Sequence, residues 1–247
     1  MNIMKTRSLS HNVWALSLTS LSLPFAASLH ADILAQYDME TSGSRHIAST
    51  VAADVTAGNL TGNNLNAPSS FILSSVPGGS GDDYIAWSRS AGIARTDAIG
   101  VIADGTFFSF TLTPDAGRTI SLDSITFDAA AGTGGPSDRQ FYLFADKTTY
   151  TSGNVLASAS TIAGSPLLPY NTTTFDQGFF ADLTGSAFQN IADSVTFRIY
   201  IATPNVSQNV GFDNITINGT VIPEPATYAL LGGLSALALV VSRRRRV

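Results

Sequence analysis

The 247-residue sequence contains no cysteine. That absence excludes disulfides, thiolate zinc sites, iron–sulfur clusters and cysteine nucleophiles. Histidine is nearly absent from residues 32–221, where His46 stands alone, so a zinc site of three histidines cannot form there. A domain of this length still buries enough apolar surface to fold without covalent cross-links.

Positive charge is also scarce in the middle of the chain. Residues 32–221 hold seven basic and seventeen acidic residues, a formal charge of −10, and Lys147 is their single lysine. The net charge of −5 for the whole chain conceals this, because the other basic residues lie at the two ends. Nucleic-acid binding requires clustered Lys and Arg that release counterions from phosphates. The composition therefore excludes nucleic acid as a partner.

The N-terminus has the three-part layout of a secretory signal peptide. Lys5 and Arg7 precede the apolar run 13–23, and the small-residue segment 26–28 follows. We expect cleavage after Ala31, because a strand-like sequence begins directly afterwards; cleavage at the end of the small-residue segment is the alternative. Residues 1–31 then act as a signal peptide for export across the inner membrane, with an uncleaved membrane anchor as the competing interpretation.

The C-terminal segment predicts a transmembrane helix. Residues 226–241 carry no charge, and a helix of that length covers about 24 Å of a hydrocarbon core of about 30 Å. A buried core helix is the alternative, but the cluster Arg243–Arg246 favours a membrane helix with its basic end in the cytoplasm. Directly before it, Pro223-Glu224-Pro225 contains two prolines that fix φ and lack backbone donors. We expect this tripeptide to be an accessible spacer that joins neither the last strand nor the helix.

Residues 222–246 together resemble the PEP-CTERM sorting domain, also labelled the ice-binding protein C-terminal domain. The resemblance rests on the proline motif, a small-residue-rich helix with Gly232 and Gly233, and the arginine finish. It implies processing by an exosortase, an integral-membrane cysteine transpeptidase, and a final location in the cell envelope or outside the cell. Such tails occur in Gram-negative bacteria that make exopolysaccharide, which is the implied partner. The implied sorting residues are Pro223, Glu224, Pro225, Arg243, Arg244, Arg245 and Arg246.

Residues 32–221 show the period-2 pattern of β-strands. In Ser194–Ala202, Val195, Phe197, Ile199 and Ile201 fall on one face, with Thr196, Arg198 and Tyr200 on the other. We expect replacement of Arg198 by alanine to cost little, unless Arg198 caps an acidic cluster. Other strand-like runs occur at 33–39, 70–73, 84–87, 105–113, 119–128, 139–146, 155–161, 172–183 and 211–221.

These runs, separated by turn residues and without a convincing amphipathic helix, predict an all-β fold, an antiparallel β-sandwich. A short helix around residues 183–191 stays open. The resemblance adds that the sandwich is of the jelly-roll, lectin-like kind. The similar segments 122–128 and 212–218 are interpreted as strands entered through an Asx turn.

Calcium is an open alternative for the body, because Asp82-Asp83 and Asp213-Asn214 could supply hard oxygen ligands. Aspartates solvated in turns explain the same residues, and no EF-hand spacing is present, so no cofactor is assigned. A glycosidase needs two positioned carboxylates, and no pair can be nominated, so no enzyme is predicted.

Two functions remain. The first is a structural or adhesive protein associated with exopolysaccharide. The second is a carbohydrate-binding module, calcium-assisted in one version, in which Trp87 stacks on a sugar ring with Tyr84 nearby. The alternative for Trp87 is a core position, where most aromatic side chains of a sandwich lie.

Overall fold

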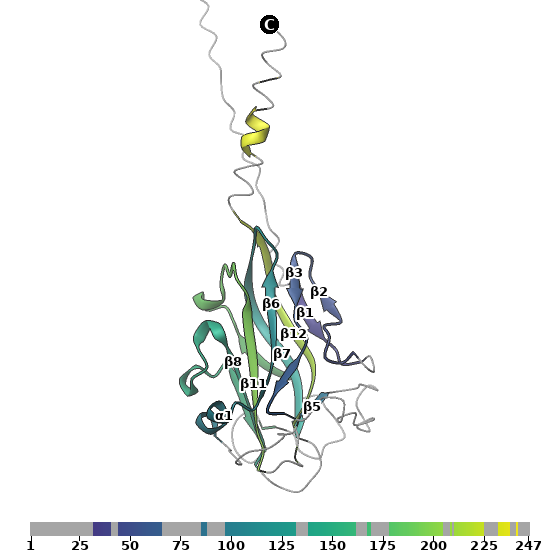
Figure 1. The fold of residues 1–247 in the computed structure, drawn as a ribbon, viewed down its shortest axis with the longest axis vertical. Helices are drawn as coiled ribbons and strands as arrows, with labels where there is room; N and C mark the ends of the chain where they lie inside the picture. The colour runs from purple at the N-terminus through teal and green to yellow at the C-terminus, as the bar shows by residue number, and fades with distance from the viewer. Residues whose placement is uncertain are drawn as a thin grey trace, which may run out of the picture.

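The computed structural model describes residues 32–40, 44–65, 85–87, 97–131, 138–161, 167–168, 178–204, 208, 210–224, 232–237 and 241. They form two antiparallel β-sheets packed face to face, as Figure 1 shows. The prediction of an all-β antiparallel sandwich is thereby confirmed. The signal peptide and the arginine cluster lie outside the described residues.

The first sheet has the strand order β10–β7–β12–β1–β2, and β5 also pairs with β12. Its strands are β1 (Asp32–Tyr37), β2 (Thr50–Val51), β5 (Ile85–Trp87), β7 (Arg118–Ala131), β10 (Gly178–Asp182) and β12 (Val210–Pro223). The second sheet has the order β3–β6–β11–β8–β9, with β4 also paired to β6. Its strands are β3 (Val55–Ala57), β4 (Thr61–Asn63), β6 (Phe107–Pro114), β8 (Gln140–Ala145), β9 (Ala157–Ser160) and β11 (Val195–Ala202).

Within the sandwich, the described non-strand elements are short. They are the helix α1 (Ala98–Asp104) and the 3₁₀ turns η2 (Asp146–Thr148), η3 (Ser152–Asn154) and η4 (Ser186–Phe188). The helix possible at 183–191 is therefore only the single turn η4. The helix α1 was not predicted from the sequence, although its two ends carry ordinary capping residues. The Asp97 carboxylate accepts the Gly100 N–H at 2.7 Å, and Gly105 closes the helix with φ of 64°.

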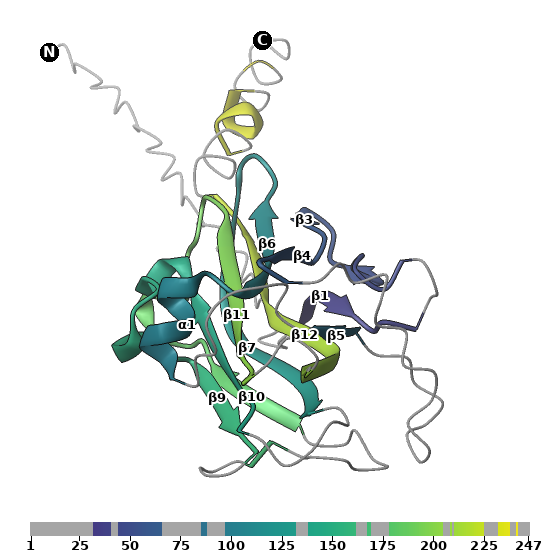
Figure 2. The ribbon, with the colours of Figure 1, turned by 60° about the horizontal axis from the view of Figure 1, so that its bottom comes forward.

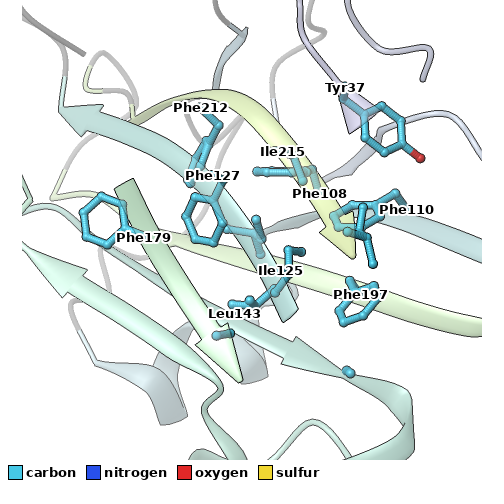
Figure 3. Packing of buried hydrophobic residues seen from close by; sticks show 14 of the residues in the cluster. Tyr37, Phe108, Phe110, Ile125, Phe127, Leu143, Phe179, Phe197, Phe212 and Ile215 are labelled. Carbon is cyan, nitrogen blue, oxygen red and sulfur yellow. The ribbon is translucent and has the colours of Figure 1, made fainter. Parts of the chain in front are cut away.

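Phenylalanine rings from both sheets fill the core (Figure 3). Phe127, Phe179 and Phe212 come from the first sheet, and their partners across the core include Phe141 and Phe108 of the second. Phe141 meets Phe179 edge-on with ring centroids 4.9 Å apart, and Phe108 meets Phe212 at 5.0 Å. Such edge-to-face contacts stabilise a core beyond the burial of area alone.

The predicted register of β11 is confirmed on its inner face. Val195, Phe197, Ile199 and Ile201 are all buried in the core cluster. Tyr200 points to the opposite face, as predicted, yet it is only 2% exposed. The outer face of this sheet is thus covered, which the strand pattern alone did not reveal.

The similar segments 122–128 and 212–218 lie side by side in the centre of the first sheet. Thr126 pairs with Thr216 and Ser124 with Asn218, because β7 and β12 run antiparallel. Both segments are strands, as predicted, but each lies inside a 14-residue strand that begins earlier, so the entry through an Asx turn is wrong. The pairing of β7 with β12 is irregular in these segments: its register shifts between Asp213 and Thr216 and again between Asn218 and Gly219.

The strand β12 runs further than the sequence predicted. Pro223 is its last residue and pairs with Arg118, and the Glu224 N–H donates to the Gly117 carbonyl at 3.0 Å. The expectation that the proline motif joins no strand is therefore wrong for Pro223, whereas Glu224 lies just beyond the strand and keeps this one hydrogen bond. Proline fits at a strand end, where its missing N–H interrupts little of the ladder, and Glu224 supplies the next bond. Pro225 lies outside the described residues.

Both ends of the sandwich domain lie at one pole. Asp32 at the start of β1 pairs with Gly219, four residues before the end of β12. Figure 1 shows a helical turn beyond this pole, at residues 232–237. Its Leu234 and Leu237 are exposed, as is Val241 further on. Within the part of the chain that the structure describes, no helix is long and apolar enough to span a bilayer.

Candidate functional site

The structure brings two predicted candidate groups onto neighbouring strands. Trp87 lies on β5, and its backbone pairs with Val210 at the start of β12. Asp213 and Asn214 follow three and four residues later on β12. Tyr84 and the Asp82-Asp83 pair lie outside the described residues.

Asp213 and Asn214 form a hydrogen-bonded group with Asp128, which pairs with Asp213 across β7 and β12. The Asn214 N–H donates to Asp213 Oδ1 at 2.7 Å, and its side-chain amide reaches Asp213 Oδ2 at 3.3 Å and Asp128 Oδ2 at 3.4 Å. Asn214 adopts a φ of 51°, a left-handed conformation that Asn tolerates. Amide donors thus serve both carboxylates. Among the described residues, no three acidic, histidine or cysteine side chains converge, and calcium stays an untested alternative.

The outer face of the second sheet is covered by a second apolar cluster. Its buried members are Val101 of α1 with Phe144, Tyr200 and Ala202 of β8 and β11. Tyr200 contacts Phe144 edge-on at 5.5 Å between ring centroids. Figure 2 shows α1 lying against this side of the sandwich. This face is therefore occupied by the protein's own side chains.

Arg198 belongs to the same covered face. Its guanidinium carbon lies 4.4 Å from the Phe107 ring centroid and 4.0 Å from that of Tyr150. Burial raises the pKa of Tyr150 to about 12, although the Arg198 charge acts in the opposite direction. An arginine held between two rings packs through its flat surfaces as well as its charge. The expectation that replacing Arg198 costs little did not foresee this packing.

The outer face of the first sheet carries polar side chains in register. One row across five strands consists of Phe180, Thr126, Thr216, Gln36 and Thr50. The adjacent row on β10, β7 and β12 consists of Asp182, Ser124 and Asn218. We call this surface the open face and define it by Gln36, Ser124, Thr126, Phe180, Asp182, Thr216 and Asn218.

Hydroxyl and amide groups dominate the centre of the open face. The Asn218 amide donates to Ser124 Oγ at 3.3 Å, and Thr216 Oγ1 donates to the Asn214 carbonyl at 3.2 Å. All of the central side chains are half-buried, as expected for neighbours on a flat sheet. The described helix α1 and turn η2 both contact β11 and so lie over the other sheet. The open face can therefore offer hydrogen-bond donors and acceptors to a ligand.

Phe180 is the conspicuous residue of the open face. It is 62% exposed, whereas the preceding Phe179 is buried in the core at 2%. The segment Gly178–Asp182 alternates strictly, so two adjacent phenylalanines in it must point to opposite faces. That doublet was the signal by which the sequence could have revealed Phe180. Phe180 falls in the predicted strand-like run 172–183 but was not predicted as a site residue.

A groove adjoins Phe180 where the edges of the two sheets meet. It has a volume of about 560 Å³ and is lined by residues 155–158 and 178–180. The strands β9 and β10 lie side by side there, as Figure 2 shows. A volume of this size falls within the usual range of small-ligand sites. Phe180 thus stands where the polar open face and the groove meet.

Comparisons with known proteins give only distant likenesses. No family model and no curated relative matches the sequence. Among solved structures, TmCBM61 in complex with β-1,4-galactotriose matches at 7% identity and a TM-score of 0.32, covering 70% of this chain and 90% of that one.

Two further solved structures are similar. The K1 cleaved adhesin domain of Lys-gingipain from Porphyromonas gingivalis W83 matches at 13% identity and a TM-score of 0.36, with 74% of this chain and 95% of that chain covered. The CBM22-1 xylan-binding domain of Paenibacillus barcinonensis Xyn10C matches at 10% identity and a TM-score of 0.31, with 76% and 95% covered. The sandwich assignment rests on the strand pairing described above.

Proposed function

We propose that this protein is an exported, exosortase-sorted cell-envelope protein with an adhesive role, and that its sandwich binds carbohydrate at the open face and groove around Phe180. The observation that carries the binding proposal is the asymmetry of the two outer faces. One is covered by α1 and a second apolar cluster, whereas the other presents polar side chains and a 62% exposed phenylalanine.

The chemistry of this surface suits a sugar. An exposed aromatic ring contacts the apolar face of a sugar ring, and neighbouring polar groups fix its orientation. Thr126 lies directly beside Phe180, and Thr216 lies beyond it on the next strand. The groove supplies a second wall next to the same ring. A glycan chain could thus contact Phe180 while its hydroxyls bond to the threonines and amides.

Glycan binding at Phe180 is tested with the full-length protein on a glycan array. Phe180→Ala should abolish selective, saturable binding, because it removes the exposed ring without opening the core. Ile99→Ala is the matched control, because Ile99 is 69% exposed on α1 and lies outside the open face. Equal binding by wild type and Phe180→Ala would exclude this surface. Repeating the array with a chelator tests the calcium-assisted alternative.

The sorting part of the proposal is supported by the tail sequence and by the position of the chain ends. The N-terminal strand begins and β12 ends at the same pole, so a signal peptide and a membrane tail would leave the sandwich together. Replacing Pro223-Glu224-Pro225 by alanines should leave export intact and block removal of the C-terminal segment. The mass of the membrane-extracted protein distinguishes the outcomes, with Ile222→Ala as the neighbouring control. Identical processing of all three proteins would refute exosortase sorting.

A further inference from the structure

The strand β10 places a carboxylate beside the exposed ring of Phe180. Asp182 follows Phe180 by two residues, so both side chains point to the open face, about 6.6 Å apart along the strand. Asp182 is exposed, and Ser124 lies opposite it on β7. An aromatic ring and a carboxylate are therefore adjacent at the edge of the candidate site.

Thr184 fixes this carboxylate in one orientation. Its N–H donates to Asp182 Oδ1 at 2.8 Å, and its hydroxyl donates to the same oxygen at 2.7 Å. These two hydrogen bonds lower the pKa of Asp182, so the group is ionised at neutral pH. Within the described part of the chain, Oδ2 of Asp182 receives no hydrogen bond. One oxygen is thus held by the protein while the other faces solvent.

Among the described residues, the rest of the open face does not neutralise that charge. Its other members are Gln36, Ser124, Thr126, Phe180, Thr216 and Asn218, none of which is ionisable. The described ion pairs lie elsewhere, between Arg118 and Asp54 and between Lys147 and Asp193. Residues 32–221 as a whole carry a formal charge of −10. Uronate or sulfated polymers would meet like charge at this face, whereas a polycation would meet opposite charge.

We infer that the ligand of this face is a cationic glycan, a polymer that contains unacetylated amino sugars. This inference rests on the proposed carbohydrate-binding function and names the class of ligand. The sugar ring packs on Phe180, and the protonated amine forms a charge-assisted hydrogen bond with Asp182 Oδ2. Because the carboxylate is exposed, the pair contributes modestly and depends on salt.

The experiment compares two probes that differ at the amino group, which is protonated in one and carries a neutral acetyl amide in the other. Oligomers of β-1,4-linked glucosamine and their N-acetylated counterparts are titrated against the full-length protein at low and high NaCl. We expect tighter binding of the glucosamine oligomer at low salt, and loss of that advantage at high salt. Asp182→Asn should weaken its binding about two- to fivefold, the effect typical of an exposed charge pair, and leave the acetylated oligomer unaffected.

Asp193→Asn is the matched control. It also removes one negative charge, but Asp193 pairs with Lys147 of η2 at 2.7 Å, outside the open face. An equal loss in this variant would show nonspecific attraction and overturn the inference. The inference of a cationic ligand would also be overturned if both oligomers bound with equal affinity, or if the protein preferred polygalacturonate. In that case a loss of binding in Phe180→Ala would still support the proposed carbohydrate site. If neither oligomer binds and the array shows no dependence on Phe180, the proposed function itself fails.

Discussion

The same substitution, Phe to Ala, should have different effects on stability in the core and on the open face, and Phe197→Ala and Phe180→Ala test this. Phe197 is fully buried and stacks on Phe110 with ring centroids 5.3 Å apart, whereas Phe180 is 62% exposed. Emptying a large buried aromatic position costs about 3–5 kcal/mol. With a urea slope of about 2 kcal/mol/M, the midpoint of unfolding falls by about 1.5–2.5 M.

Phe180→Ala removes the same atoms from the surface. Its cost should stay below about 1 kcal/mol, because mainly strand propensity is lost. Urea unfolding followed by circular dichroism measures both variants under one condition. A larger midpoint shift for Phe180→Ala than for Phe197→Ala would mean that the inner and outer faces are misassigned. Because folded domains are typically stable by about 5–15 kcal/mol, the loss in Phe197→Ala is a large fraction of the total.

Three further predictions address backbone packing, pH and the domain boundary. Gly219→Ala should destabilise the protein by about 1–3 kcal/mol or more in urea unfolding, because the added Cβ would lie 2.2 Å from the Ser121 carbonyl oxygen. Gly232→Ala should be neutral, because no described atom outside its own helix would lie within 4 Å of a Cβ added there. Burial raises the pKa of Tyr37 above its value in the unfolded chain, so the free energy of unfolding should fall as the pH rises above about 10. Tyr37→Phe should reduce this loss of stability at alkaline pH, and an unchanged dependence of stability on pH would contradict the prediction. Residues 32–224 expressed alone should be β-rich with or without reductant. This fragment should melt at a higher temperature than residues 32–221, because only the longer one keeps the Pro223 pairing and the Glu224–Gly117 hydrogen bond. Equal melting temperatures would refute a role for that strand end.

The strands with strict alternation could be predicted from the sequence. Phe108, Phe110 and Leu112 of β6 and the alternating residues of β11 all reach the core as expected. Their apolar and polar positions repeat with the period of the strand, so local pattern and burial agree. The strands β2, β3 and β4 were missed because they have only two or three residues each, too few for a period to show.

The candidate site could not be predicted, because alternation does not tell which outer face is covered. Tyr200 and Phe180 both point away from the core, yet one is 2% and the other 62% exposed. The difference is made by α1, whose Val101 packs near Tyr200 in the second cluster. That contact joins residues about 100 positions apart in the sequence, and strand order decides which sheet receives the helix. The Phe179-Phe180 doublet was the one local sign of an outward ring.

The end of β12 sets how the open face would be oriented in the membrane-attached precursor, before the proposed removal of the tail. The sheet holds the chain to Glu224, and the sequence predicts a membrane helix from residue 226, so a single sequence position separates the sandwich from the predicted helix. One extended residue spans at most about 3.6 Å. The sandwich would then stand close to the membrane, with the long strands β7 and β12 directed away from it, as the long axis in Figure 1 suggests. The open face follows those strands, so before the tail is removed it would point sideways along the membrane surface rather than into it.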